Sequence, residues 1–289
     1  MVPEHKISWF VLIIILSLYL FFPSGLSTTD GWAYAASVKH LGEIFHPHHL
    51  LYNALGLVFS WLPSKAGFEI ISCMKVMNAI FALLTLLVIQ QILYSFKVID
   101  KQVVIITCLA GLSFGVLRYA TENETYIVPL FFALLASFNY IKFMTAGKTR
   151  YAFYTGLWAA IAVLFHQIYI FWWFGLLMGV FIERKKKPAL LFIIISLIAP
   201  VAYLIVILAN KGGIGWNNIY DFLFKGFGEN IRLEITGMGI LLSFINLIRS
   251  FIQVHGYVLN MVRENMLWLI PGVVSLFFVV LAFLRLPER

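Results

Sequence analysis

Long apolar runs and short polar segments alternate along this chain. A helix that crosses a membrane needs about 20 mostly apolar residues, and several of these runs reach or approach that length. Each of them therefore predicts a membrane-spanning helix. The runs that we predict to cross are Ile7–Phe22, Ile70–Phe96, Val103–Leu117, Tyr126–Phe143, Tyr151–Phe165, Ile168–Ile182, Pro188–Ala209 and Met266–Leu284.

A shorter apolar run, Leu50–Leu62, lies between Pro47 and Pro63. It has about half to two thirds of the length of a span, which is typical of interfacial or re-entrant helices. If this run does not cross, three basic segments fall on one side, and the positive-inside rule identifies that side as the cytoplasm. These segments are Lys97–Lys101, Lys142–Arg150 and Arg184–Lys187.

Three polar segments then face the opposite, outer side: Thr28–Tyr52, Arg118–Thr125 and His166–Gln167. A further segment, Asn210–Gly237, is rich in glycine, carries charges of both signs and predicts a second large outer loop. Met238–Val262 is apolar but interrupted by polar residues. It predicts either a helix lying on the outer surface, which we favour, or a polar-lined span.

The predicted fold is all-α: a polytopic transmembrane helical bundle of about eight spans, with juxtamembrane helices in the outer loops. We expect one integral membrane domain, residues 1–289. Its seven-span core is residues 1–209, and residues 210–289 add the second outer loop, the interfacial helix and the last span.

The composition agrees with a membrane protein. Hydrophobic residues make up 62% of the 289 residues and charged residues 12%, whereas about a quarter of an average soluble domain is charged. The net charge of +8 comes from basic residues scattered over short loops, which indicates topology signals and not a nucleic-acid surface. Cys73 and Cys108 each lie inside an apolar run, which favours small core residues over a disulfide.

Ionisable residues at a membrane boundary are costly unless they face water or a partner, so each is a candidate for function. Asp30 follows the first predicted span by a few residues. A carboxylate there can act as a general base, or can bind a cation or an acceptor group. The alternative is a structural N-cap of a helix over Gly31–Gly42.

Four histidines lie in the same outer segment, three of them in the sequence His46-Pro47-His48-His49. Adjacent histidines cannot all turn towards one ion, so the spacing does not favour a tight transition-metal site. The favoured interpretation is that His46 or His48 hydrogen-bonds a substrate while Pro47 fixes the turn.

The second outer segment carries Arg118, Glu122 and Glu124. Two carboxylates at this spacing can share a divalent ion or hold an acceptor, and an arginine can bind a phosphate bidentately. The alternative is a solvated turn in which one glutamate caps the next helix and pairs with Arg118. His166, after the fifth predicted span, emerges on the same side; when protonated it can contact an anion, and the alternative is a packing role.

The order of these parts resembles the GT-C superfamily of polytopic membrane glycosyltransferases, and within it the protein O-mannosyltransferase-like branch. That branch has an early acidic residue in its first outer loop, an Ala-rich helix and a His-Pro turn. The matching residues here are Asp30-Gly31, Ala33, Ala35, Ala36 and His46-Pro47.

The branch also has an Ala-Glu-x-Tyr turn in its second outer loop, which Thr121–Tyr126 resembles, with Glu124 aligned to the glutamate. The resemblance extends over roughly residues 7–171. The chain departs from the pattern at Trp32, where the branch has an acidic residue, and at His48-His49, where it has Pro-Gly. These departures put the sugar in doubt.

The resemblance implies an enzyme that moves a sugar from a polyprenyl-phosphate donor to a protein or glycolipid acceptor, with membrane lipids and no nucleic acid as its other partners. It implies that Asp30 is the base, and that Glu124 or Glu122 orients the acceptor or holds a cation. A divalent ion, Mg²⁺ or Mn²⁺, stays open as a cofactor. The residues expected to bind substrate or carrier phosphate are His46, His48, Arg118, His166, Lys211 and Arg232.

The expected location is the bacterial inner membrane, with the active site on the periplasmic face. Two other classes stay open: a transporter of lipids or small molecules, and a membrane subunit without catalytic activity. A transporter should carry broken or ionisable spans near the bilayer midplane. An enzyme instead requires Asp30, Glu124 and His166 to meet at one outer site that a lipid-linked substrate can reach.

Overall fold

The computed structural model describes residues 6–25, 27–183, 186–224, 237–251 and 265–266. It divides into two compact units, Met1–Glu234 and Ile235–Arg289. In the described ranges the regular secondary structure is helical and no strand occurs, which confirms the all-α prediction. The prediction of a single membrane domain stays a prediction.

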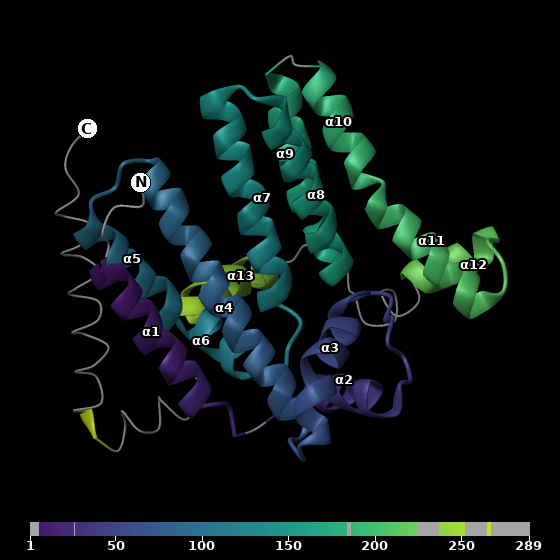
Figure 1. The fold of residues 1–289 in the computed structure, drawn as a ribbon, viewed down its shortest axis with the longest axis horizontal. Helices are drawn as coiled ribbons and strands as arrows, with labels where there is room; N and C mark the ends of the chain where they lie inside the picture. The colour runs from purple at the N-terminus through teal and green to yellow at the C-terminus, as the bar shows by residue number, and fades with distance from the viewer. Residues whose placement is uncertain (1–5, 26, 184–185, 225–236, 252–264, 267–289) are drawn as a thin grey trace. The chain divides into compact units, whose positions relative to one another are not determined.

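The first unit contains helices α1 to α12, and the second contains α13, Gly237–Phe251 (Figure 1). A one-turn 3-10 helix, η1, lies at Gln167–Tyr169. The helices of the first unit are α1 Lys6–Phe21, α2 Thr29–His40, α3 Tyr52–Lys65, α4 Ile70–Ser95, α5 Asp100–Leu112, α6 Phe114–Thr121, α7 Ile127–Ala146, α8 Thr149–Phe165, α9 Ile170–Ile182, α10 Lys186–Ser196, α11 Ile198–Lys211 and α12 Trp216–Phe224.

Several helices are long and apolar enough to cross a membrane. Among the described residues these are α4, α7 and the continuous pair α10–α11, Lys186–Lys211. Helices α5 and α6 pass the same criterion together but are bent by 61° relative to each other, which gives a fourth if the pair is one broken span. Ser8–Phe21 and Gln167–Ile182 are shorter apolar helices. The described residues therefore contain three or four candidate spans by length and composition, and the predicted count of eight stays a prediction.

The break between α5 and α6 was not predicted, because the apolar run Val103–Leu117 passes through it without interruption. Ser113 adopts an extended conformation there, and its hydroxyl bonds back to the Ala110 carbonyl at 2.7 Å. The Gly111 carbonyl next to the break accepts a buried hydrogen bond of 2.7 Å from the Tyr19 hydroxyl. Tyr19 therefore satisfies a backbone group that would otherwise lack a partner inside an apolar bundle.

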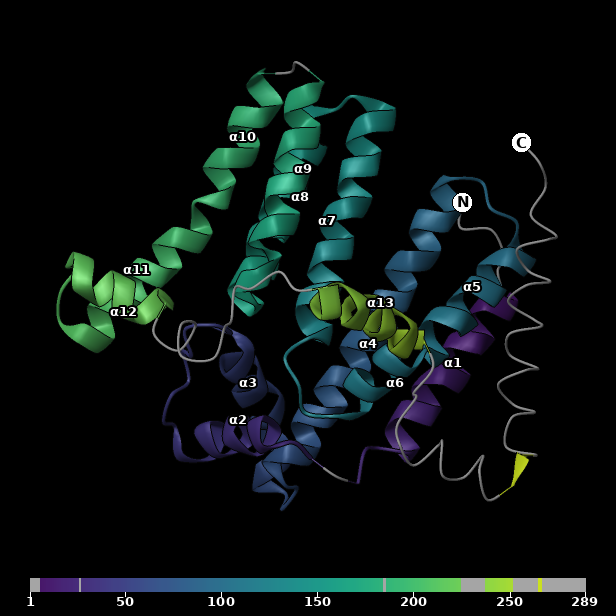
Figure 2. The same ribbon diagram turned by 180° about the vertical axis from the view of Figure 1, so that it is seen from behind.

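The helices of the first unit pack around α4 and α8. Helix α4 contacts α1, α3, α6 and α7, and α8 contacts α7, α9, α10 and α11. Buried apolar side chains of α1, α4 and α7 form one core, and those of α7, α8, α9 and α10 form a second. Helices α2 and α3 lie side by side next to the start of α4 (Figure 1 and Figure 2). The run predicted to be a short interfacial or re-entrant helix is α3.

Local sequence explains how α2 begins and ends. The Thr28 side chain caps the helix by accepting a hydrogen bond of 3.0 Å from the Gly31 amide, and the residues that follow include three alanines. The helix ends at Leu41, which is in the left-handed conformation at φ 52°, and Lys39 and His40 in the last turn complement the helix dipole. Thr28, and not Asp30, is therefore the cap.

Some predictions fall partly or wholly outside the described residues. Arg232 lies outside them, and so does the span Met266–Leu284 after its first residue. Within the predicted Gly-rich loop the structure has a short helix, α12, which begins after the last of its early glycines. Helix α13, Gly237–Phe251, covers the first part of the predicted segment Met238–Val262. Residues 252–262 of that segment are not among the described residues.

Candidate functional site

Asp30 stands in the first turn of α2 with its side chain exposed. Because Thr28 caps the helix, the carboxylate has no capping role. Among the described residues it makes no hydrogen bond and no ion pair. It is therefore available to a ligand, as a base or a binding carboxylate must be.

The predicted outer turn between α6 and α7 is buried instead of solvated. Relative exposure is 2% for Glu122, 0% for Asn123 and 7% for Glu124. The N-cap of α7 is Tyr126, and no side chain caps it. The alternative of a solvated turn with a capping glutamate is therefore wrong, and two carboxyl groups are held inside the protein, where they need partners.

A polar side chain on α4 satisfies the backbone of this turn. The Asn78 amide donates to the Glu122 carbonyl at 2.7 Å, to the Glu124 carbonyl at 2.8 Å and to the Tyr52 hydroxyl at 3.0 Å. The Tyr52 hydroxyl in turn donates to the Asn123 side-chain oxygen at 2.8 Å. Three segments that are far apart in the sequence are thus joined in one buried network.

The negative charge of Glu122 is paired with a lysine on α4, Lys75, and not with Arg118. The Lys75 ammonium lies 3.7 Å from the Glu122 carboxylate, and both side chains are largely buried. Lys75 also donates to the Ser24 carbonyl at 2.8 Å. The Glu122 carboxylate accepts a hydrogen bond of 2.8 Å from the backbone amide of Asn123. Glu122 therefore has a charged partner and a hydrogen-bond donor within the protein, and its role in binding an acceptor stays a prediction.

Glu124 is joined directly to the start of α2. Its carboxylate accepts a hydrogen bond of 2.6 Å from the Thr28 hydroxyl, and Asn123 donates to the Gly31 carbonyl at 2.6 Å. A Cβ atom at Gly31 would lie 2.8 Å from the Asn123 carbonyl oxygen, so glycine is needed for this close approach. The contact brings Glu124 next to the first turn of α2, which carries Asp30.

The charge of Asp30 acts on the carboxyl group of Glu124. Burial raises the pKa of Glu124, and the charges of Asp30 and Glu122 raise it further, whereas the Thr28 hydroxyl and the charge of Arg118 oppose the shift. A buried carboxyl group thus lies beside an exposed one, and such a pair can divide acid and base roles.

Aromatic rings and histidines surround these carboxyl groups. Burial raises the pKa of Tyr34, and the charges of Asp30 and Glu124 raise it further. The ring of Tyr34 lies 5.9 Å from that of His49, which is 4.4 Å from the ring of His166. His166 also lies 5.6 Å from the ring of Tyr126, between centroids. We call Asp30, Glu124, Tyr34, Tyr126 and His166 the Asp30 cluster.

Asp30, Glu124 and His166 were predicted to lie together at one outer site. Arg118 also belongs here, because its charge acts on both Glu124 and Tyr126. The cluster lies beside the histidine segment, since His49 contacts both Tyr34 and His166. The three predicted residues therefore fall in one region, at the start of α2, the start of α7 and the end of α8.

His46 to His49 form a tight hairpin that is fastened to the end of α8. An isolated β-bridge joins His46 and His49, and the His49 amide donates to the His46 carbonyl at 3.1 Å. Gln167 holds the hairpin: its amide nitrogen donates to the Pro47 carbonyl at 2.9 Å, and its backbone amide donates to the His48 carbonyl at 3.1 Å. The Tyr203 hydroxyl donates to the same Pro47 carbonyl at 3.0 Å.

Gln167 also fixes the tautomer of His48. The Gln167 side-chain oxygen lies 3.1 Å from Nδ1 of His48. Because the Gln167 nitrogen is oriented by the Pro47 carbonyl, its oxygen must accept, and Nδ1 of His48 therefore carries the proton in the neutral ring.

We expect Gln167→Ala to loosen the hairpin. The variant loses both side-chain hydrogen bonds to the hairpin but keeps the backbone bond to the His48 carbonyl. The two lost bonds together weaken the local structure by about 2 kcal/mol, so the backbone amides of residues 46 and 48–52 should exchange with deuterium roughly 30-fold faster. Hydrogen–deuterium exchange with mass spectrometry measures this. Unchanged exchange would show that Tyr203 and the backbone hold the hairpin without Gln167.

Two histidines are kept neutral by their surroundings. Burial, followed by the charges of His166, His46 and His48, lowers the pKa of His49 to about 3. Burial, followed by the charge of His48, lowers the pKa of His166 to about 4. At neutral pH both rings are therefore uncharged donors and acceptors.

Stability should fall in acid because of these two histidines. Their folded pKa values lie below the unfolded value of about 6.5, so between pH 6.5 and pH 4 the unfolded chain binds protons that the folded chain does not. The free energy of unfolding should decrease across this window and level off near pH 3. Glu124, whose pKa is raised, acts in the opposite direction.

Thermal unfolding in detergent at a series of pH values tests this. A double variant, His49→Gln with His166→Gln, should lose part of the acid sensitivity of the unmodified protein. The exposed His40, changed to Gln, is the matched control. Equal pH dependence in the double variant and the unmodified chain would contradict the assignment.

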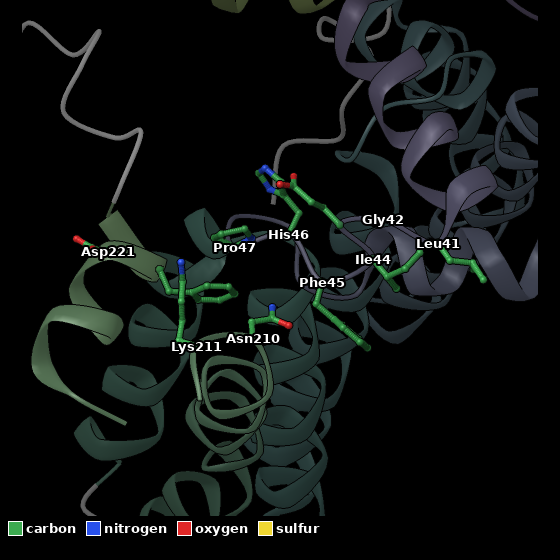
Figure 3. Close-up of a pocket in the computed structure, with 11 residues that line it drawn as sticks. Leu41, Gly42, Ile44, Phe45, His46, Pro47, Asn210, Lys211 and Asp221 are labelled. Atoms are coloured by element: carbon green, nitrogen blue, oxygen red, sulfur yellow. The ribbon is translucent and has the colours of Figure 1, made fainter. Parts of the chain in front are cut away.

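Lys211 lies apart from the Asp30 cluster, at a cavity of about 700 Å³. The cavity is lined on one side by the loop after α2, including Glu43 and His46, and on the other by α11 and α12, including Lys211 and Asp221 (Figure 3). Of the residues predicted to bind phosphate, Arg118 and His166 are thus at the Asp30 cluster, and Lys211 is at the cavity. His46 lines the cavity and stacks on His49 at 5.9 Å between centroids.

No group of three or more His, Cys, Asp or Glu side chains is arranged to hold a metal ion in the part of the chain that the structure describes. The proximity of His46, His48 and His49 does not amount to such a group, since their rings meet edge-on or stacked.

Several residues of the site were not identified from the sequence: Thr28, Tyr34, Tyr52, Lys75 and Asn78. Lys75 and Asn78 gave a usable signal, because a lysine and an asparagine three residues apart near the start of an apolar span mark a polar stripe on one face of a helix. The tyrosines gave none, since they are common in membrane helices.

The sequence was compared with models of known protein families and with curated proteins. No family model matches this chain, and no curated protein matches it.

Proposed function

We propose that the chain is an integral-membrane glycosyltransferase of the GT-C type. It moves a sugar from a polyprenyl-phosphate donor to a hydroxyl of a protein or glycolipid acceptor. The observation that carries the proposal is the grouping of Asp30, Glu124 and His166, which come from three outer segments far apart in the sequence. An exposed carboxylate without a partner, beside a buried carboxyl group and neutral histidines, is suited to proton transfer.

In the proposed reaction, Asp30 takes the proton from the acceptor hydroxyl as its oxygen attacks the anomeric carbon. The bond between that carbon and the carrier phosphate breaks, and the phosphate leaves with the electron pair. Attack from the face opposite the phosphate inverts the anomeric carbon. Glu124, held by Thr28, orients the acceptor or keeps the proton that Asp30 passes on.

Negative charge builds up on the leaving phosphate and has to be stabilised. Arg118 is the cation beside Glu124 and Tyr126, so we assign the phosphate to it. His166 adds a neutral hydrogen-bonding group beside Tyr126. A divalent cation is compatible with this scheme if the donor phosphate binds it, because the described residues are not arranged as a metal site.

The proposal includes the topology expected of a GT-C enzyme in a bacterial inner membrane. Helices α1, α8 and α9 then cross together with the long helices α4, α7 and α10–α11 and the broken pair α5–α6, and Met266–Leu284 completes eight spans. The Asp30 cluster faces the periplasm in this arrangement. A helix of 13 to 17 residues, as α1, α8 and α9 are, crosses a bilayer of about 30 Å when flanking residues or local thinning complete its length.

A lipid or small-molecule transporter is the second candidate, favoured by the bend of 61° between α5 and α6. Transporters use broken helices of this kind to expose backbone groups to a substrate. Here, however, the Gly111 carbonyl next to the break is bonded to Tyr19, which leaves it unavailable to a substrate.

The test is to incubate the purified full-length chain in lipid nanodiscs with a panel of polyprenyl-phosphate sugars and short peptide or glycolipid acceptors. Mass spectrometry then detects an acceptor that gains the mass of one sugar. Transfer that requires the intact chain supports the proposal. Failure to turn over any donor, together with movement of a fluorescent lipid across proteoliposomes, would instead establish the transporter.

A further inference from the structure

The cavity between the loop after α2 and the helices α11 and α12 is separate from the pair of carboxyl groups at the Asp30 cluster. Its volume of about 700 Å³ falls within the range of small-molecule sites, roughly 300–1,000 Å³. Leu41, Ile44, Phe45 and Phe222 provide apolar walls, and the polar side chains are Glu43, His46, Asn210, Lys211 and Asp221. Four of these polar residues are labelled in Figure 3. A cavity lined in this way suits a ligand that has both apolar faces and hydrogen-bonding groups.

The charges around the cavity do not favour an anion. Glu43 and Asp221 carry carboxylates and Lys211 carries the ammonium. Burial, followed by the charge of His48, lowers the pKa of His46, so that this ring is neutral at physiological pH. The balance of charged side chains is therefore one negative, which repels a phosphate group.

The charged side chains at the cavity are available to a ligand. Lys211, Asp221 and the side chain of Glu43 have no ion pair or hydrogen bond among the described residues. These three side chains are exposed and can contact a ligand that enters the cavity.

We infer that this cavity binds a neutral polyhydroxylated group, such as the saccharide part of a glycan, and not a phosphate. Carboxylates accept hydrogen bonds from hydroxyl groups, an ammonium and an amide donate to them, and neutral imidazole does either. Asn210, which also lines the cavity, supplies the amide. The apolar walls fit the carbon–hydrogen faces of a sugar ring.

The inference deepens the proposed function, because it makes this cavity the place where a saccharide substrate is held. His46 lines the cavity and stacks on His49, whose ring contacts both Tyr34 and His166 of the Asp30 cluster. A sugar in the cavity is therefore held next to the histidine hairpin, close enough to Asp30 that the charge of Asp30 acts on His46. Lys211 and His46 serve here as hydrogen-bonding groups for hydroxyls and not as phosphate ligands.

Binding of free sugars tests this without any transfer reaction. The full-length chain in nanodiscs is titrated, by isothermal calorimetry, with neutral hexosides and short oligosaccharides, and in parallel with the corresponding hexose phosphates and with inorganic phosphate. We expect at least one neutral saccharide to bind and inorganic phosphate not to compete with it. The variants Glu43→Gln and Asp221→Asn should each weaken that saccharide about tenfold, since each removes a charged acceptor.

Glu69→Gln is the matched control, since Glu69 is an exposed carboxylate at the start of α4 without a side-chain capping bond. Its saccharide affinity should equal that of the unmodified chain. Phosphate binding without saccharide binding would overturn the inference, and so would unchanged saccharide affinity in both cavity variants. Saccharide binding that these variants weaken, in a chain that transfers sugar from no donor, would leave the cavity assignment standing and remove the proposed function.

Discussion

Replacing Asp30 by asparagine should lower the rate constant of sugar transfer by about 100- to 10,000-fold, the usual contribution of a general base. Asparagine keeps the size of the side chain but cannot take a proton. The Asp30 side chain is exposed and makes no contact that the fold uses, so the variant should fold normally. Initial rates of transfer at saturating donor and acceptor measure the effect.

The control for this variant is Glu69→Gln, which removes an exposed carboxylate elsewhere on the chain. Its transfer rate should match that of the unmodified protein. The pH dependence provides a second readout: the acidic limb of the rate profile, which reports the base, should disappear in the Asp30 variant. A variant with full activity would exclude Asp30 as the base, even if the protein is a transferase.

Replacing Asn78 by alanine should destabilise the protein more than changes at exposed positions. The variant leaves the Glu122 and Glu124 carbonyls and the Tyr52 hydroxyl without their donor in a buried region. The Tyr52 hydroxyl keeps its bond to Asn123. The two unpaired carbonyls cost about 1–3 kcal/mol each, so we expect a loss of about 2–6 kcal/mol, or roughly 5–20 °C in Tm. Thermal unfolding followed by intrinsic fluorescence measures the shift.

Asn139 in α7 is the matched control for Asn78. It is also a largely buried asparagine on a long apolar helix, but its side chain bonds only to the Leu135 carbonyl of its own helix among the described residues, at 2.8 Å. Asn139→Ala should therefore cost much less. Equal losses at the two positions would mean that the network around Asn78 contributes no more than any buried amide.

The helical class and the long helices follow from the apolar runs, because a run long enough to cross a bilayer has to satisfy its backbone internally. Ile70–Phe96 coincides with α4 apart from its last residue, and the run Tyr126–Phe143 corresponds to α7. The break at Ser113 could not be inferred in this way, since it depends on a hydroxyl, that of Tyr19, from a different helix.

The site was predicted in its charged residues but not in what surrounds them. Asp30, Glu124 and His166 stood out because ionisable groups are rare in so apolar a chain. The burial of Glu122 and Glu124 was missed because the run that carries Lys75 and Asn78 was read as a plain span. Lys75 pairs with the Glu122 carboxylate, and Asn78 pairs with the backbone carbonyls of both glutamates. Contacts between distant segments are set by tertiary packing and not by local pattern.

The bonds that fasten the first outer segment to the rest of the protein have a consequence for how the chain is made. Its partners are Asn78, Asn123, Glu124 and Gln167, and the Leu51 amide bonds to the Leu164 carbonyl at 3.1 Å. The Tyr203 hydroxyl also bonds to the Pro47 carbonyl, so the nascent chain has to extend beyond residue 203 before this segment can reach all its final contacts. During insertion the histidine hairpin thus makes its last contact only after more than a hundred further residues have been added, and a chain that stops earlier leaves this segment without its supporting bonds.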